Sequence, residues 1–381
     1  MVIDLKNTED TRDVVHRAVQ ALTEGKLVVF PLETVYTAAA SALHEGAVAR
    51  LVELTGSGDG NQLADRPLFP LAVKSYAEAL DYVPQMSALG QRLARRCWPG
   101  PITMVFPGGQ PESLLRQLPL SVQRVVSPEQ QLGLRVPGHQ MLLEVLKLVV
   151  GPLVLGTAHS APHPEPTTAQ EVAQGLGDST IMILDDGRCR FSQSASVLAV
   201  QDHQFEVLRP GVVSDQNLRR LASQIIVFVC TGNTCRSPMA EMICRKLLAE
   251  RLNCPLDQLE EHGIIVLSAG ISAMMGSRAS PEGVQVLKDQ YGLDLSNHVS
   301  QPLSEQMIRQ ADHLLVMTRG HRHVILTEYP DAADRTRLLC RDESDVSDPI
   351  GGPLEFYQRC AQQIETALRE WISEFVPLPG H

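Results

Sequence analysis

The stretch VFVCTGNTCRSPMAE, residues 227–241, decides the fold of the C-terminal part of the chain. An apolar strand ends at Cys230, turn-forming residues follow, and Pro238 suits the first turn of a helix that we expect to begin near Ser237. A strand that runs through a short loop into a helix is typical of α/β domains. The backbone N–H groups of such a loop and the positive end of the helix dipole point at one place. The sequence therefore predicts an anion-binding loop.

The side chains of this loop predict phosphate chemistry. The donors that bind an anion also favour a thiolate, so we expect Cys230 to act as a nucleophile, the alternative being a buried strand cysteine. Arg236 can hold two phosphoryl oxygens with its planar guanidinium, which lysine cannot do. We expect Ser237 to hydrogen-bond the sulfur and Asn233 to hold a left-handed turn. The other predicted members of the phosphate-binding loop are Thr231, Gly232, Thr234 and Cys235.

An acidic loop near the C-terminus supplies the candidate general acid, which must protonate the leaving group. The segment DESDVSDPIGG, residues 342–352, contains Asp342, Asp345 and Asp348 before the last expected helix. We predict that Asp348 is the acid, because the proline and glycines that follow it shape a loop that can lean over the phosphate site. The alternative is an acidic surface turn.

Apolar runs and helical stretches alternate in the second half of the chain. The runs lie at residues 225–229, 264–267, 313–317 and 337–339. The expected helices span residues 238–253, 281–291, 304–310 and 354–375. This alternation predicts a parallel sheet covered by helices.

The first half is less regular and predicts a mixed α/β or α+β domain. A helix is expected at residues 11–24, and strands at 27–30, 102–106, 132–137, 152–157 and 181–186. We place the domains at residues 1–212 and 223–381, joined by a linker at 213–222 that includes a short helix. The glycine-rich stretch at 56–66 lacks the ending of a nucleotide-binding P-loop, so we interpret it as a solvated connection.

Composition narrows the class of protein. The 381 residues are 44% hydrophobic and 20% charged, which is typical of globular proteins. The net charge of −11 makes nucleic acid an unlikely partner. With neither a long apolar run nor a signal peptide, we expect a cytoplasmic protein without membrane association. The eight cysteines contain no CxxC pair, so we expect no metal.

The cysteine loop carries a family resemblance. CTGNTCRSPMAE at 230–241, SAG at 268–270, NHVS at 297–300 and DP at 348–349 are similar, in this order, to the low-molecular-weight protein tyrosine phosphatases. The resemblance implies a four-stranded parallel sheet and a phosphorylated protein as substrate. It also implies a two-step reaction without a cofactor. Cys230 forms a phosphocysteine, and Asp348 first protonates the leaving group and then activates water.

Two positions bear on which phosphorylated residue is the substrate. Thr234 resembles the bacterial protein arginine phosphatases, whereas many tyrosine phosphatases of the family carry a bulkier aliphatic residue there. The residues after Asp-Pro tend to be aromatic in tyrosine-specific members, but here they are Ile350 and Gly351. We therefore hypothesise that phosphoarginine is preferred. Phosphotyrosine is the alternative, in which Thr234 is an ordinary turn residue.

The first half resembles the YrdC family of threonylcarbamoyl-AMP synthases. The matching stretches are GKLVVFPLETVYTAAASA at 25–42, WPGPITMVF at 98–106, LGLRVPGH at 132–139, PTTAQEV at 166–172, DDG at 185–187 and LRPG at 208–211. The resemblance implies synthesis of threonylcarbamoyl-AMP from ATP (with Mg), threonine and bicarbonate for tRNA modification. The site residues that it implies are Glu33, Thr34, Tyr36, Thr103, Arg135 and Arg209.

Several positions depart from the YrdC pattern. The family's Lys-x-Arg is Thr55-Gly56-Ser57, its Ser-Ala-Asn is Thr157-Ala158-His159, and its Ser-Thr pair is Ala195-Ser196. Arg66 is a candidate replacement for a lost charge. We interpret the domain as one with eroded catalytic motifs, either a nucleotide sensor or a protein-binding module. A bifunctional enzyme that still makes threonylcarbamoyl-AMP is the alternative, and the oligomeric state stays open.

Overall fold

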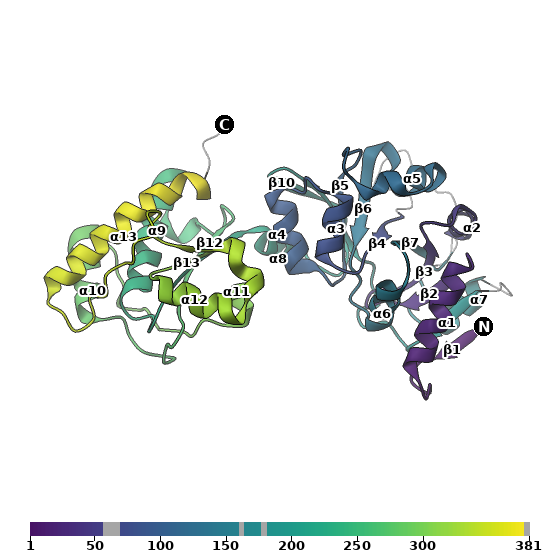
Figure 1. Ribbon diagram of the computed structural model, residues 1–381, viewed down its shortest axis with the longest axis horizontal. Helices are drawn as coiled ribbons and strands as arrows, with labels where there is room; N and C mark the ends of the chain where they lie inside the picture. The colour runs from purple at the N-terminus through teal and green to yellow at the C-terminus, as the bar shows by residue number, and fades with distance from the viewer. Residues whose placement is uncertain (56–68, 160–163, 177–180, 377–381) are drawn as a thin grey trace. The chain divides into compact units, whose positions relative to one another are not determined.

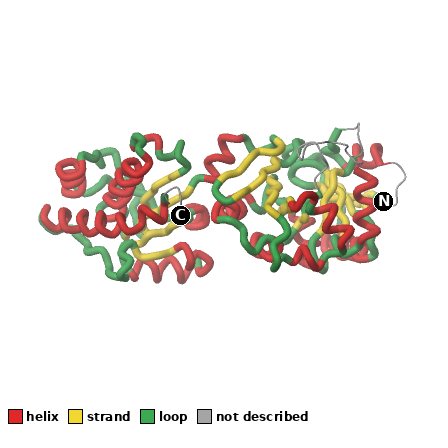
Figure 2. The backbone as a smooth tube through the Cα atoms, turned by 90° about the horizontal axis from the view of Figure 1, so that it is seen from above, coloured by secondary structure: helices red, strands yellow, loops and turns green. Residues whose placement is uncertain are grey.

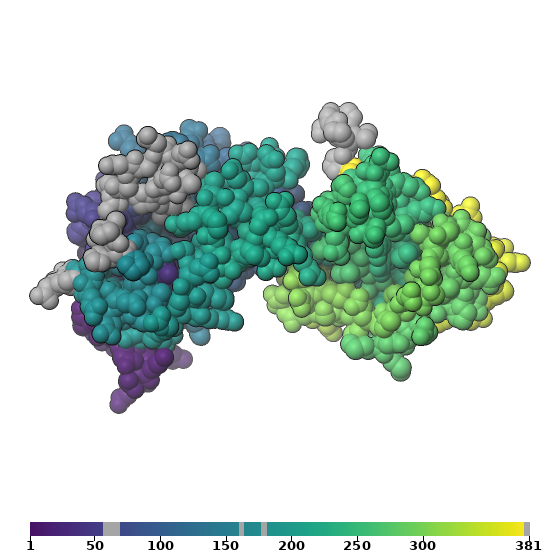
Figure 3. All heavy atoms as spheres, turned by 180° about the vertical axis from the view of Figure 1, so that it is seen from behind, coloured from purple at the N-terminus to yellow at the C-terminus, as the bar shows by residue number. Residues whose placement is uncertain are grey.

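The computed structural model describes residues 1–55, 69–159, 164–176 and 181–376; the remaining segments are grey in Figure 1, Figure 2 and Figure 3. The chain divides into two units, Met1–Leu221 and Ala222–His381, called here the N-terminal and the C-terminal unit. The short helix expected between them is α8 (Asp215–Ala222). Each unit has its own sheet and its own apolar core.

The C-terminal unit contains a parallel sheet with the strand order β12-β11-β13-β14. The strands are β11 (Gln224–Cys230), β12 (Ile264–Gly270), β13 (His313–Val316) and β14 (Thr336–Leu338). Six consecutive residues of β11, from Ile225 to Cys230, are buried, which explains why this strand is a continuous apolar run in the sequence. The predicted parallel sheet is confirmed.

Helices cover both faces of this sheet (Figure 1, Figure 2). They are α9 (Arg236–Leu252), α10 (Pro281–Val286), α11 (Glu305–Gln310), α12 (Arg319–Glu328) and α13 (Leu354–Phe375). Ile226 and Phe228 of β11 belong to one apolar cluster with α9 and α13, and Val227 and Val229 to another with α11 and α12. The two clusters lie on opposite faces because alternate side chains of a strand point in opposite directions.

In the C-terminal unit, two helical segments differ from the sequence expectations. No helix is predicted at 319–328, where α12 lies, because its first five residues are Arg-Gly-His-Arg-His and show no apolar period. The helix begins at a cap instead: Thr318 Oγ1 accepts the N–H of His321. The helix expected at 281–291 is α10 followed by a π-helical turn, η4 (Leu287–Tyr291).

Within the described residues, the N-terminal unit has a mixed ten-stranded sheet in the order β1-β8-β2-β3-β7-β4-β6-β5-β9-β10. The strands are β1 (Val2–Asp4), β2 (Val28–Pro31), β3 (Tyr36–Ser41), β4 (Leu71–Ala72), β5 (Ile102–Pro107), β6 (Gln131–Arg135), β7 (Leu153–Thr157), β8 (Met182–Asp185), β9 (Ser196–Gln201) and β10 (Gln204–Arg209). The expected mixed α/β class is confirmed. Strand β3 was not expected, because its run of three alanines has little strand propensity.

The N-terminal unit also contains helices. They are α1 (Thr11–Thr23), α2 (Glu45–Thr55), α3 (Tyr76–Tyr82), α4 (Ala88–Cys97), α5 (Leu120–Val126), α6 (Gln140–Leu148), α7 (Ala169–Leu176) and α8. In α1, Val14, Ala18 and Leu22 repeat at helical spacing and are buried in the cluster that contains Val28 of β2. Nowhere in the described segments does a helix combine the length and the apolar character needed to span a membrane.

Candidate active site at Cys230

The candidate site lies where β11 ends and α9 begins. Cys230 is the last residue of β11 and Arg236 the first of α9, so the loop between them faces the start of a 17-residue helix. Asn233 adopts the expected left-handed conformation, with φ of 54°. Gly270 lets β12 approach this loop, because a Cβ atom there would lie 2.6 Å from the carbonyl oxygen of Thr231. The glycine of the SAG motif therefore has a steric role.

Two hydrogen bonds surround the sulfur of Cys230, which is 3% exposed. The backbone N–H of Asn233 donates to Sγ over 3.2 Å, and Ser237 Oγ lies 3.0 Å from Sγ. Asn233 Nδ2 donates to Ser237 Oγ over 3.0 Å, and the Ser237 hydroxyl also lies 3.3 Å from the carbonyl oxygen of Ala269, so its proton has two acceptors within reach, that carbonyl and the sulfur. The geometry expected for Ser237 is present.

Asn233 also ties the loop to its surroundings. Its Nδ2 donates to Ser268 Oγ over 2.9 Å, and its Oδ1 accepts the N–H of Gln301 over 2.9 Å. Its carbonyl oxygen lies 2.8 Å from His298 Nε2, which gives the NHVS motif a structural role. Ser268 in turn donates to Glu241 over 2.6 Å; burial raises the pKa of the Glu241 carboxyl. These contacts hold the loop in shape.

Arg236 and Asp348 come together, although they are 112 positions apart in the sequence. Arg236 Nη2 lies 2.6 Å from Asp348 Oδ2, and the two side chains are 6% and 44% exposed. The other carboxylate oxygen, Oδ1, accepts the N–H of Ile350 over 3.2 Å. Asp342 instead accepts the N–H of Ser344, and Asp345 accepts the N–H of Arg319. Of the three candidate acids, Asp348 is the one that contacts Arg236.

His321 belongs to this site but is absent from the sequence predictions. Its Nε2 lies 2.9 Å from Oγ1 of Thr231, the residue that follows Cys230. Burial and the positive charge of Arg236 lower the pKa of His321 to about 4, so the imidazole is neutral at pH 7. The available signal was its position after β13, since the carboxyl ends of parallel strands meet at one edge of the sheet.

The two candidate specificity residues lie in different environments. Thr234 is half-buried, its Oγ1 lies 3.6 Å from Cys235 Sγ, and its carbonyl oxygen accepts the N–H of Ser280 over 2.9 Å. Cys235 is buried beneath Tyr357, whose hydroxyl lies 3.7 Å from its sulfur. Ile350 is 67% exposed, two residues after Asp348. An exposed aliphatic side chain thus stands beside the candidate acid.

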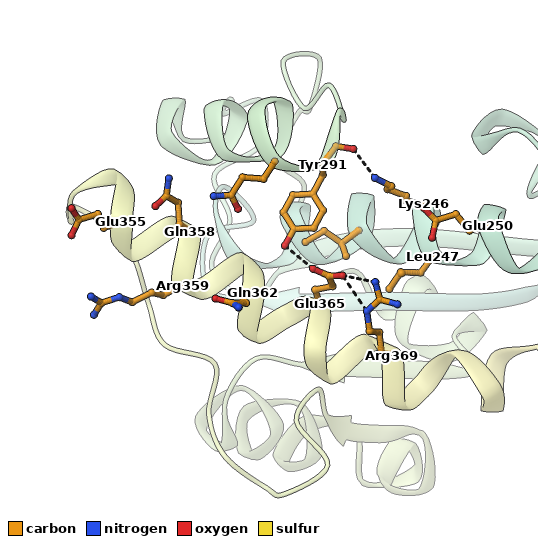
Figure 4. Close-up of a pocket in the computed structure, with 12 residues that line it drawn as sticks. Lys246, Leu247, Glu250, Tyr291, Glu355, Gln358, Arg359, Gln362, Glu365 and Arg369 are labelled. Carbon is orange, nitrogen blue, oxygen red and sulfur yellow. Dashed lines mark hydrogen bonds and ion pairs between the residues drawn. The ribbon is translucent and has the colours of Figure 1, made fainter.

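A groove of about 680 Å³ in the same unit shares no lining residue with this site. It lies along α13 and is drawn in Figure 4. Its polar groups contact one another: Tyr291 donates to Glu365 over 3.1 Å, Glu365 pairs with Arg369, and Lys246 donates to the carbonyl of Tyr291.

In the N-terminal unit, four of the predicted site residues line one small cavity of about 40 Å³, and they are Thr34, Thr103, Arg135 and Arg209. Glu33 does not line it but pairs with Arg135: Glu33 Oε1 lies 2.6 Å from Arg135 Nη2, which also donates to Thr34 Oγ1 over 3.1 Å. Glu165 also lines the cavity and accepts a hydrogen bond from Ser194. Sequence reasoning missed Glu165.

Other N-terminal candidates are separate from this cavity. The Tyr36 hydroxyl donates to the carbonyl of Gly187 over 2.7 Å and lies 3.1 Å from Asp185 Oδ1, so its contacts join strands of the sheet. Thr55 Oγ1 donates to the carbonyls of Leu51 and Val52 within α2. Gly56, Ser57 and Arg66 lie outside the described residues, as does the rest of the glycine-rich stretch.

Comparison with known proteins places each unit in a family. Residues 20–211 match the Sua5/YciO/YrdC family model, described as telomere recombination. Residues 225–376 match the low molecular weight phosphotyrosine protein phosphatase model.

Two curated relatives and one solved structure illustrate these matches. A protein-arginine-phosphatase of Geobacillus stearothermophilus is 37% identical over 38% of this chain and 90% of its own length. A threonylcarbamoyl-AMP synthase of Pyrococcus abyssi is 30% identical over 54% of this chain, which spans only 56% of that relative. A P. abyssi Sua5 structure is similar with a TM-score of 0.50 and 20% identity, over 71% of this chain and 91% of that one, which shows the fold alone.

The chain therefore belongs to both families: it carries a Sua5/YrdC domain, followed by a low-molecular-weight protein tyrosine/arginine phosphatase domain that makes it a hydrolase.

Proposed function

We propose that the C-terminal unit hydrolyses phosphoarginine in proteins in preference to phosphotyrosine, with Cys230, Arg236 and Asp348 as catalytic residues. The observation that carries this proposal is the arrangement around one loop. The Cys230 sulfur accepts the N–H of Asn233 and lies 3.0 Å from Ser237 Oγ. Arg236, whose guanidinium pairs with Asp348, is the first residue of the helix that follows. A nucleophile, a cation for the phosphoryl oxygens and an acid thus meet at one helix start.

The proposed reaction has two steps. The Cys230 thiolate attacks phosphorus and the bond to the guanidine nitrogen breaks; protonated Asp348 gives its proton to that nitrogen, and arginine leaves. In the second step the Asp348 carboxylate takes a proton from water, the oxygen attacks phosphorus, and the sulfur leaves as a thiolate. Asn233 N–H and Ser237 stabilise that thiolate, while Arg236 binds two phosphoryl oxygens throughout.

In this proposal, groups of the protein itself stabilise the negative charge of the phosphoryl group. Arg236 supplies a fixed positive charge, and the backbone N–H groups from Thr231 to Arg236 supply donors at the start of α9. The proposed chemistry therefore needs neither a metal nor an organic cofactor.

The preference for phosphoarginine rests on two residues and on the relatives. Thr234 is smaller and more polar than a bulky aliphatic residue, which suits a charged, planar guanidine group better than a phenol ring. Ile350 offers no flat aromatic face for stacking on tyrosine. The protein-arginine-phosphatase of G. stearothermophilus supports the same preference. Phosphotyrosine remains the competing substrate.

Steady-state rates test this preference. The kcat/KM of the full chain is measured on a phosphoarginine protein and on the same protein phosphorylated on tyrosine, for the wild type and for Thr234→Ile. We expect the wild type to favour phosphoarginine and Thr234→Ile to lose most of that advantage, with little loss on phosphotyrosine. Faster turnover of phosphotyrosine by the wild type would sink the arginine preference.

For the N-terminal unit, we propose a ligand-binding module without full synthase chemistry that senses a nucleotide. Its Arg135 is engaged by Glu33 and Thr34, and Tyr36 by Gly187 and Asp185. Thr55 and His159 stand where the family carries a basic residue and an asparagine. Gripping the triphosphate of ATP with Mg is harder without those groups. The match to the synthase family favours a second candidate, a bifunctional enzyme.

One assay separates these two candidates. The full chain is incubated with ATP, Mg, threonine and bicarbonate, and threonylcarbamoyl-AMP is measured alongside the phosphatase rate. The sensor predicts ATP binding that changes the phosphatase rate without adduct formation. Accumulation of the adduct at an enzymatic rate would establish the bifunctional enzyme instead.

A further inference from the structure

Asp348 lies on a segment that is held from three directions. Just before it, Val346 is 1% exposed, and its N–H donates over 2.8 Å to the carbonyl of Met317, the residue that follows β13. The carbonyl of Val346 accepts Arg236 Nη1 over 3.4 Å. The third direction is α13, from which Gln363 reaches the backbone on both sides of Val346.

Gln363 binds this segment with both ends of its amide. Its Oε1 accepts the N–H of Ser347 over 3.2 Å, and its Nε2 donates to the carbonyl of Asp345 over 3.1 Å. A side-chain amide that accepts and donates in this way takes the place of a neighbouring peptide group. Ser347 is the residue directly before Asp348, so the bond to its N–H fixes the backbone from which the carboxylate extends.

The carboxylate itself has few constraints. The Asp348 side chain is 44% exposed, pairs with Arg236 and accepts the N–H of Ile350. When a phosphoryl group takes the Arg236 guanidinium, the first of these contacts must be given up. The position of Asp348 then depends on its backbone, which Gln363 and Val346 hold.

We infer that Gln363 is a positioning residue for the general acid: its amide holds the segment 345–347 so that Asp348 can reach the leaving group after Arg236 has bound phosphate. The inference rests on the proposed role of Asp348. Within the described residues, the Gln363 side chain hydrogen-bonds Asp345, Ser347 and Cys340, none of which belongs to the phosphate-binding loop. It should therefore affect protonation of the leaving group rather than binding of phosphate.

Leaving-group dependence separates this role from a general structural one. A poorly placed acid matters more when the leaving group is strongly basic. We therefore compare kcat/KM on p-nitrophenyl phosphate, whose leaving group is weakly basic, with kcat/KM on phenyl phosphate. For Gln363→Leu of the full chain, we expect a loss of about tenfold on phenyl phosphate and a clearly smaller loss on p-nitrophenyl phosphate. The inhibition constant for inorganic phosphate should not change.

The chain offers a matched control and a second variant. Gln362 precedes Gln363 on α13, is exposed, and lines the groove of Figure 4. Gln362→Leu should therefore leave kcat/KM on both substrates unchanged. Gln363→Glu keeps the shape and the acceptor but cannot donate to Asp345 when ionised. It should show a similar substrate-dependent loss at neutral pH if Gln363→Leu fails to fold.

The Asp348→Asn variant separates the proposed role of Asp348 from the proposed role of Gln363. If Asp348 is the acid, this variant loses far more activity on phenyl phosphate than on p-nitrophenyl phosphate. Suppose that Asp348→Asn behaves in this way, but that both Gln363 variants lose kcat/KM equally on the two substrates or bind phosphate more weakly. The inference about Gln363 is then overturned, and the proposed function stands. Equal losses in Asp348→Asn itself would instead overturn the role of Asp348, and the inference about Gln363 with it.

Discussion

The two units each contain a buried arginine bound to a carboxylate, and the difference between the two pairs is instructive. Arg236 and Asp348, and likewise Arg135 and Glu33, are joined at 2.6 Å, and both arginine side chains are 6% exposed. The carboxylates differ: Asp348 is 44% exposed, whereas Glu33 is 11% exposed. Glu33 also accepts the N–H of Gly138 over 3.0 Å.

Exposure of the carboxylate decides what each pair can do. A carboxylate in contact with water can leave its arginine at modest cost, so Arg236 can exchange Asp348 for a phosphoryl group. A pair in which the carboxylate is buried as well is costly to separate, because water cannot replace the arginine as the partner of that carboxylate. We therefore expect the contact in the C-terminal unit to open during the proposed reaction, and the contact in the N-terminal unit to stay closed and stabilise the fold.

The largest expected effect concerns the exchangeable pair. Asp348→Asn removes the acid, so we expect kcat/KM on a phosphorylated protein to fall by about 10²- to 10⁴-fold. The free energy of unfolding should change by less than about 1 kcal/mol, because the pair is partly exposed. Asp342→Asn, in the same loop, is the control. A loss of activity as small as that of the control would remove Asp348 from the reaction.

The buried pair should show the opposite behaviour. Glu33→Gln leaves the Arg135 charge without its carboxylate, so we expect the N-terminal unit to lose about 3 kcal/mol of unfolding free energy. Phosphatase activity of the full chain should not change. Urea unfolding followed by tryptophan fluorescence measures this, since Trp98 and Trp371 lie in different units and Trp371→Phe isolates the first. A destabilisation below about 1 kcal/mol would contradict the distinction drawn between the pairs.

A smaller effect, on phosphate affinity, is expected at Gly270, where the absence of a side chain lets the predicted phosphate-binding loop lie close to β12. Gly270→Ala places a Cβ atom 2.6 Å from the carbonyl oxygen of Thr231 and 2.9 Å from the backbone nitrogen of Asn233, so the loop must shift. We expect the inhibition constant of inorganic phosphate to rise about tenfold, equivalent to about 1.4 kcal/mol. Gly263→Ala, which meets no neighbouring atom but has a φ of 74°, controls for a general loss of stability. Unchanged phosphate affinity in Gly270→Ala would show that the loop is not held against β12.

The smallest effect is a pH dependence at His321. Its pKa is about 4 in the folded protein against 6.5 ordinarily, so between these values the unfolded chain binds a proton that the folded chain does not. Titration of His321 therefore leaves the free energy of unfolding unchanged above pH 6.5 and lowers it as the pH falls from 6.5 toward 4. Arg236 opposes the protonation, whereas Asp345 and Asp348 favour it. His321→Asn should lose less stability than the wild type between pH 7 and pH 5 in urea titrations; an identical slope would contradict the burial argument.

The sequence predicts those features of the molecule that depend on neighbouring residues along the chain. The strand, loop and helix from 225 to 252 could be predicted because apolar run, turn residues and helix start are contiguous. Asp348 is predicted as the general acid from the proline and glycines that follow it. The predicted parallel sheet followed from alternating runs and helices.

The missed features depend on contacts between distant segments. His321 meets Thr231 across 90 positions, and Gln363 meets Ser347 from another element. No local pattern marks an amide on an amphipathic helix as a partner of a loop. The pairing of Glu33 with Arg135 crosses 102 positions, so the motif residues could be identified without showing that they neutralise one another.

The central claim, that Cys230 carries the phosphoryl group, is tested most directly by trapping the intermediate. The full-length Asp348→Asn variant is mixed with a phosphoarginine protein, quenched in acid within the first turnover, digested, and analysed by mass spectrometry. We predict that the peptide containing Cys230 gains the mass of one phosphoryl group, and that Cys230→Ala in the same background does not. Product formation by Asp348→Asn with no phosphate on Cys230, or with phosphate on another residue, would contradict the account.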